Sequence, residues 1–113
     1  MKTVEEMIDI FVSFATTKFT TLDPENTGAS YEIKEFIWER SRKYHRVYSV
    51  TYEGRKSIWC FVEAKTGSVL KPATYKAPAK GERYNLLCVD SRTALFTYMD
   101  KHGGCLYADR LQS

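Results

Sequence analysis

The sequence is poor in the features that mark secreted, disulfide-stabilised or membrane proteins. It has three cysteines, Cys60, Cys88 and Cys105, and an odd number at wide spacing argues against a disulfide framework and for a reducing compartment. No apolar run approaches the ~20 residues that a membrane-spanning helix needs. The start, MKTVEEMIDI, carries acidic residues where a signal peptide needs cations. We therefore expect a cytoplasmic protein that does not associate with a membrane.

Catalytic and metal-binding patterns are missing too. His102 and Cys105 are three residues apart, but no C-x2-C pair accompanies them, and there is no glycine motif for binding phosphates. A Cys–His dyad would have to bring Cys88 or Cys105 to His45 or His102, and nothing in the sequence does so. The simpler interpretation makes Cys60 and Cys88 small buried hydrophobic residues and His102 a cation at a helix end. We expect no enzyme activity, no metal site and no cofactor.

The sequence does contain enough apolar material for one domain. Of its 113 residues, 43% are hydrophobic and 14% are aromatic. A chain of this length can bury roughly 65% of the surface that its unfolded form exposes, so it needs no disulfides or metals to fold. We expect residues 1–113 to form a single domain.

Residues 3–22 have the pattern of an amphipathic helix. Thr3 and Glu6 have the spacing of a capping box, in which each side chain binds a free backbone amide at the helix start. Threonine pairs near the end lower helix propensity, and the turn-forming residues 23–28 (DPENTG) terminate the helix. Apolar residues recur at the three- and four-residue spacing of a single helical stripe: Val4, Met7, Ile8, Phe11, Phe14, Ala15, Phe19 and Leu22.

The middle of the chain predicts an antiparallel sheet. Segment 31–38 fits both helical spacing and strand composition, and we interpret it as a strand because clear strands follow it. Alternation with a period of two marks 43–53. Segment 57–63 is apolar on both faces, with Trp59 and Phe61 on one and Ile58, Cys60 and Val62 on the other. It is therefore expected to be a central strand, and 68–71 returns beside it.

A second helix follows a proline-containing loop, residues 72–84. Asp90 or Ser91 can cap this helix, and Gly103-Gly104 can end it. Its apolar side would hold Ala94, Leu95, Tyr98 and Met99. The predicted fold class is thus α+β, an antiparallel meander of about four strands with an N-terminal and a C-terminal helix packed on the sheet.

Positive charge gathers in the same middle region. Between Arg40 and Arg83 there are eleven Lys or Arg residues and three acidic residues. Lysines attract phosphates and flat aromatic rings accept unstacked bases, although tyrosines also form strands well and lysines and prolines also protect sheet edges. The candidate binding surface consists of Arg46, Tyr48, Lys71, Tyr75, Lys76, Lys80, Arg83 and Tyr84.

Residues 60–86, CFVEAKTGSVLKPATYKAPAKGERYNL, resemble a motif in small proteins encoded by tailed bacteriophages. In those proteins a strand, a K-x-G turn and a K-A-P-A-K loop recur in this order. The resemblance covers about a quarter of the chain. It implies a viral origin and a place in the host cytoplasm or the virion, and it supplies no catalytic residue.

Two functions remain for a chain of this kind. The first is a non-catalytic interaction protein that binds a protein partner or a second copy of itself through a sheet face and the basic loop 71–84. This hypothesis rests on the large apolar side chains of the strands, because their number exceeds what a single helix readily covers. They are Phe36, Ile37, Trp38 and Trp59. The alternative is a nucleic-acid-binding accessory protein that uses the basic and aromatic middle of the chain.

Overall fold

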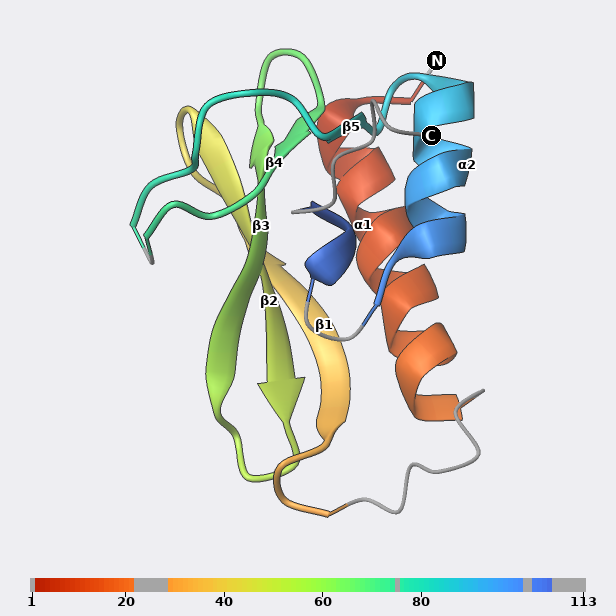
Figure 1. Ribbon diagram of the computed structural model, residues 1–113, viewed down its shortest axis with the longest axis vertical. Helices are drawn as coiled ribbons and strands as arrows, with labels where there is room; N and C mark the ends of the chain where they lie inside the picture. The colour runs from red at the N-terminus through yellow and green to blue at the C-terminus, as the bar shows by residue number, and fades with distance from the viewer. Residues whose placement is uncertain (1, 22–28, 75, 101–102, 107–113) are drawn as a thin grey trace.

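Two α-helices lie on one face of a five-stranded antiparallel sheet in a computed structural model, which describes residues 2–21, 29–74, 76–100 and 103–106 (Figure 1). The α+β class and the two terminal helices are confirmed, and the sheet has one strand more than the four expected. The strands lie in chain order, β1-β2-β3-β4-β5. The elements are α1 (Val4–Thr16), β1 (Ile33–Glu39), β2 (Tyr44–Thr51), β3 (Lys56–Glu63), β4 (Ser68–Leu70), β5 (Tyr84–Asn85) and α2 (Val89–Tyr98).

Helix α1 begins with the predicted capping box. The Glu6 amide donates to the Thr3 hydroxyl over 3.1 Å, and the Thr3 amide donates to the Glu6 carboxylate over 2.8 Å. After Thr16 the helix continues as a π-helical turn, Thr17–Thr21, where threonine pairs weaken α-helical propensity. The expected apolar stripe is buried at Val4, Met7, Ile8, Phe11, Ala15 and Phe19.

Phe14 departs from that stripe. Its side chain is 38% exposed, and its ring stacks on Phe96 of α2 with centroids 4.7 Å apart. Phe14 thus packs on the second helix and not on the sheet. Leu22 and the predicted turn at 23–28 lie outside the described residues.

Segment 31–38 is a strand, as expected, because β1 pairs along its length with β2. The predicted division of β3 into two faces was wrong. A bulge in β3, opposite Val47 and Tyr48 of β2, leaves Trp59 as the extra residue without a register partner. This shift places Trp59 in one buried cluster with Cys60 and Val62, whereas Phe61 is buried on the opposite face.

The core between helices and sheet is built around aromatic rings. The Phe11 ring lies 5.7 Å from that of Trp59 and 5.9 Å from that of Phe96, and Phe36 meets Trp59 edge-on at 6.0 Å. Phe36 and Trp59 are therefore both buried in the core on the helical side of the sheet, where Trp59 packs against Phe11 of α1. The expectation that these strand side chains exceed what the helices cover does not hold for them.

Helix α2 differs from expectation at its start and on its face. Cys88, not Asp90 or Ser91, is the N-cap residue, and it is exposed, so its prediction as a buried residue was wrong. The Ser91 hydroxyl instead accepts a hydrogen bond from the Asn85 amide. Leu95 and Met99 are buried as predicted, but Tyr98 is 66% exposed.

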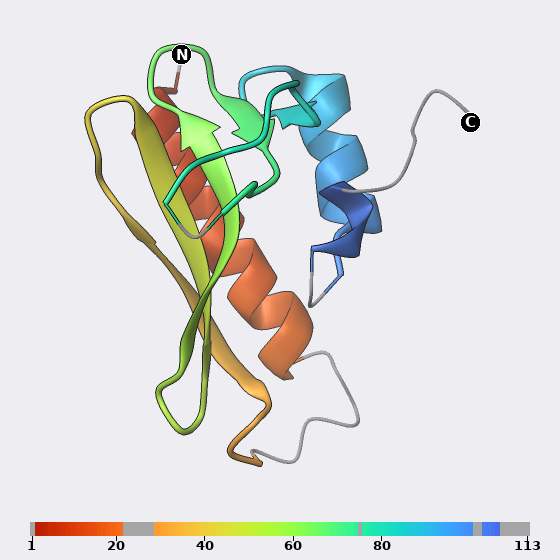
Figure 2. The same ribbon diagram turned by 60° about the vertical axis from the view of Figure 1, so that its left-hand side comes forward.

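Residues 71–83, which we call the arm, double back on themselves. Pro72 and Pro78 face each other in an isolated antiparallel bridge, and the Ala79 amide donates to the Lys71 carbonyl over 2.8 Å. The arm lies on the side of the sheet away from the helices in Figure 1 and in front of the strands in Figure 2, where that side is turned forward. Among the described residues, no helix is long and apolar enough to cross a bilayer.

Candidate anion-binding cleft

Two adjoining hollows mark the outer side of the sheet, the side away from the helices. Each has a volume of about 310 Å³. One lies between the sheet and the arm, against Tyr44, Leu70 and residues 78–82; the other lies among Arg42, Lys43 and Lys65. Because Glu63 lines both hollows, we treat them as one site and call it the outer cleft.

The topology of the meander brings these cations together. Tyr44 at the start of β2 pairs with Glu63 at the end of β3. The Ala64 amide then donates to the Lys43 carbonyl over 2.9 Å, so the β1–β2 and β3–β4 turns lie at the same end of the sheet. Arg42 and Lys43 come from the first turn and Lys65 from the second, while the arm contributes Lys80.

The acidic side chains of the cleft have hydrogen-bond partners, whereas its cationic side chains form no ion pair among the described residues. Arg42, Lys43, Lys65 and Lys80 are exposed, and none of them forms an ion pair with another residue that the structure describes. The acidic side chains already accept hydrogen bonds: Glu63 from Thr66, and Glu82 from Ser68 and Asn85. The arrangement therefore offers cationic donors to an external anion.

The predicted cationic residues fall in different environments. Lys76 and Lys80 are exposed on the arm, whereas Lys71 and Arg83, at its two ends, are half-buried. The Arg46 guanidinium lies over the Phe61 ring, 5.9 Å from its centroid. Lys80 is thus the predicted residue that lines the outer cleft, and Lys76 is exposed on the same arm.

The predicted aromatic surface is not formed by the residues expected. Tyr84 is 2% exposed and belongs to the core, and Tyr48 is 3% exposed. The Tyr48 hydroxyl donates to Glu39 over 3.0 Å, and the Lys56 ammonium covers its ring at 4.5 Å. Both tyrosines are therefore unavailable for stacking on bases. Tyr75 lies outside the described residues.

Three cations of the cleft were absent from the predicted surface: Arg42, Lys43 and Lys65. Beside them lies the half-buried aromatic residue Tyr44, whose ring centroid is 5.3 Å from the Lys43 ammonium. These residues could have been identified from the sequence by their position beside two turns, because a meander must place those turns at the same end of the sheet.

The sequence matches the profile of a family described as "Family of unknown function (DUF7717)" over residues 2–108. The chain belongs to this family. No curated protein and no solved structure matches it. The match includes both helices, the sheet and the arm, so the outer cleft lies wholly within the DUF7717 region. Because the family description names no source and no activity, the phage origin stays a prediction.

A buried histidine in this DUF7717 chain has a structural explanation. His45 is almost completely buried, and its Nδ1 accepts from the Ser41 amide over 2.9 Å. Its Nε2 must then carry the proton, which it donates to Glu5 over 2.8 Å. This hydrogen bond holds the pKa of the Glu5 carboxyl below its usual range. With both ring nitrogens engaged, His45 ties β2 to α1.

The environments of Cys60 and Cys105 favour the neutral thiol. Burial raises the pKa of Cys60 well above its usual value and raises that of Cys105 to about 11. Thiols with raised pKa values are poor nucleophiles and poor metal ligands at neutral pH. The part of the DUF7717 chain that the structure describes contains no group of three His, Cys, Asp or Glu residues able to hold a metal ion. His102 lies outside that part.

Proposed function

We propose that this protein is a small, non-catalytic interaction protein that binds the phosphate backbone of a nucleic acid in the outer cleft. The observation that carries the proposal is the set of four exposed cations, from two turns and the arm, that line the two adjoining hollows of the outer cleft and have no ion-pair partner among the described residues. Polyphosphate chains bind such surfaces through Coulomb attraction and release of counterions.

The environment of the aromatic residues favours backbone binding over recognition of bases. Tyr48 and Tyr84 are buried, which leaves half-buried Tyr44 as the aromatic side chain lining the cleft. Phosphate contacts position a protein on nucleic acid without reading its sequence. Binding should therefore be independent of sequence and should not require unstacked bases, so duplex DNA is expected to bind at least as well as single strands.

Self-association through the sheet has less support. The strand side chains that motivated it, Phe36 and Trp59 above all, are covered by the helices. An acidic protein would meet the same cations, so the decisive question is whether phosphates or carboxylates occupy the cleft.

A salt titration tests the proposal. Binding of short, fluorescently labelled single- and double-stranded DNA is followed by anisotropy as the salt concentration rises. If all four cations contact phosphates, the logarithm of the association constant falls with the logarithm of salt concentration with a slope of about −3 to −4. No binding at low salt would refute the proposal.

Matched charge reversals then locate the site. The variant K43E/K65E removes two cations of the cleft and is expected to abolish DNA binding. The control K34E/R55E makes the same change in net charge at exposed positions near the other end of the sheet and should retain most of the affinity. Equal loss in both variants would show a diffuse charge effect. Displacement of DNA by polyglutamate at equal charge would assign the cleft to an acidic protein instead.

A further inference from the structure

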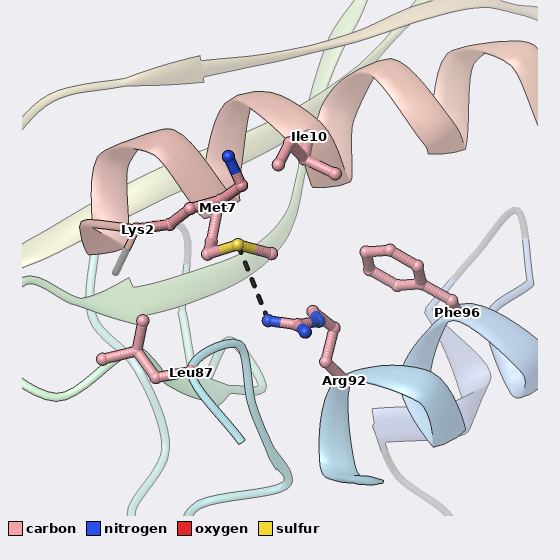
Figure 3. Close-up of a pocket in the computed structure, with 6 residues that line it drawn as sticks. All are labelled: Lys2, Met7, Ile10, Leu87, Arg92 and Phe96. Carbon is pink, nitrogen blue, oxygen red and sulfur yellow. Dashed lines mark hydrogen bonds between the residues drawn. The ribbon is translucent and has the colours of Figure 1, made fainter. Parts of the chain in front are cut away.

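A second cavity lies between the two helices, on the side of the sheet opposite the outer cleft. Its volume is about 640 Å³, which falls within the range of about 300–1,000 Å³ typical of small-molecule sites. Figure 3 shows side chains from α1, from the segment that precedes α2, and from α2 itself around this space. The residues that line it are Lys2, Met7, Ile10, Leu87, Arg92 and Phe96.

Apolar side chains make up most of the cavity wall. Met7 is buried, whereas Ile10 is 39% and Leu87 is 42% exposed. Phe96 is held in place by Phe14 and Phe11, whose rings stack on it at 4.7 and 5.9 Å. Exposed apolar side chains around a hollow with fixed walls favour a ligand with an apolar body.

Arg92 gives this wall its polar group. One guanidinium nitrogen, Nη1, donates to the Leu86 carbonyl over 3.0 Å and contacts the Met7 sulfur at 3.6 Å, which fixes the side chain against the cavity (Figure 3). A guanidinium carries five N–H donors, so others remain for a ligand. Among the described residues, no acidic side chain lines the cavity, and Lys2 adds a second cation.

We propose that this cavity binds a small amphipathic carboxylate. Its hydrocarbon or aromatic part lies against Met7, Ile10, Leu87 and Phe96, and its carboxylate meets the Arg92 guanidinium, with Lys2 at the rim. An apolar wall with cations and no acid is complementary to that ligand class and unfavourable for neutral or cationic amphiphiles. The site does not depend on nucleic-acid binding, because the cations of the outer cleft take no part in it.

Titration calorimetry with decanoate, below its micelle concentration, tests this proposal. The wild-type protein should show saturable binding of one decanoate, and decanol of the same chain length should bind more weakly. The variant R92Q keeps an amide that can donate to the Leu86 carbonyl but loses the charge. It should weaken decanoate binding by about 10-fold or more, the usual effect of losing a hydrogen bond to a charged group, and should change decanol binding less than about 2-fold.

Two variants with the same charge change supply the spatial control. Leu87→Glu places a carboxylate at the cavity rim and should abolish decanoate binding. Val89→Glu adds the same charge at a residue that is 61% exposed and does not line the cavity, so its affinity should stay near that of the wild type. Circular dichroism melting verifies that each variant is folded. When decanoate is added to the wild-type protein, the changes in backbone amide NMR chemical shifts should cluster around Met7, Leu87 and Arg92.

Several results would overturn the assignment. These are the absence of saturable decanoate binding by the wild type, equal affinity in R92Q, or equal loss in V89E and L87E. If the wild type is a dimer that the L87E variant dissociates but decanoate does not, the cavity is instead a contact between two copies of the chain. Loss of decanoate binding in K43E/K65E would show that decanoate binds in the outer cleft.

Discussion

The two sides of the sheet bury large side chains by different means. On the helical side, apolar rings cover the strand side chains: Phe11 of α1 packs on Trp59, and Phe19 of the π-helical turn packs on Phe36. On the outer side, Phe61 and Tyr48 are just as inaccessible, yet charged side chains lie over them: Arg46 over Phe61 at 5.9 Å and Lys56 over Tyr48 at 4.5 Å. Long cationic side chains can cover apolar surface with their stems and keep their charges in water.

This difference separates stability from binding. An apolar helix face buries the inner side and leaves it little charge, whereas the cationic cover of the outer side keeps positive charge exposed to solvent. The inner side should therefore contribute more to the free energy of unfolding, and the outer side should respond more to salt and to anions. Measurements on variants of both sides test this contrast.

The largest effect is expected from truncating a core ring on each side. Phe11→Ala removes a fully buried ring between Trp59 and Phe96 and should lower the free energy of unfolding by about 3–5 kcal/mol. Phe61→Ala removes a ring that is also fully buried, but the flexible Arg46 side chain above it can settle into the space. It should cost less, by about 1 kcal/mol or more. Urea unfolding measures both, and a larger loss for Phe61→Ala would invalidate the contrast.

A smaller effect concerns acid stability on the helical side. The hydrogen bond from His45 lowers the pKa of Glu5 in the folded protein. A lowered carboxyl pKa stabilises the fold above the ordinary glutamate pKa of about 4.3, and that stability is lost as pH falls through the lowered value. Glu5→Gln cannot titrate, so its free energy of unfolding should fall less steeply below about pH 4.3 than that of the wild type.

Urea unfolding from neutral pH to acid checks this prediction. Glu6 and Glu39 also have lowered pKa values, from hydrogen bonds with Thr3 and with Lys56 and Tyr48. The slope should therefore decrease in Glu5→Gln without vanishing. An unchanged slope would mean that the Glu5–His45 contact contributes no pH-dependent stability.

The smallest effect is expected on the outer side. Lys56 forms a 3.0 Å ion pair with Glu39 and lies over the Tyr48 ring, but both members of the ion pair are substantially exposed. Lys56→Met keeps most of the apolar stem and should cost less than about 1 kcal/mol in urea unfolding. A loss comparable to that of Phe11→Ala would show that the cationic cover is a main source of stability.

Features that depend on near neighbours in the chain could be predicted from the sequence. The Thr3–Glu6 capping box and the stripe through Phe11 need only residues three or four apart, and both are present. The face occupied by Trp59 could not be predicted in this way, because it depends on a bulge in β3 opposite β2. Tyr84 was likewise predicted to lie in a loop, but it pairs with Val69 and is part of the sheet.

The residues of the candidate cleft also fall into those that the sequence could predict and those that it could not. Local composition identified Lys76 and Lys80 as exposed loop cations, and both are exposed. The contribution of Lys43 and Lys65 depends on the alignment of two turns that are separated along the chain. Alternation within one strand gave no warning that Tyr48 would be covered by Lys56 of the neighbouring strand.

The order of the strands also bears on how the chain acquires its structure. Every pair of adjacent strands is consecutive in the chain, so the sheet can grow by adding one hairpin at a time. The loops between the first four strands are short, and only the arm between β4 and β5 is a longer connection. Helix α1 precedes the strands in the chain, but the rings that cover Phe11 come from residues as distant as Trp59 and Phe96. During translation its apolar stripe must therefore stay exposed or transiently bound until β3 and α2 have been synthesised.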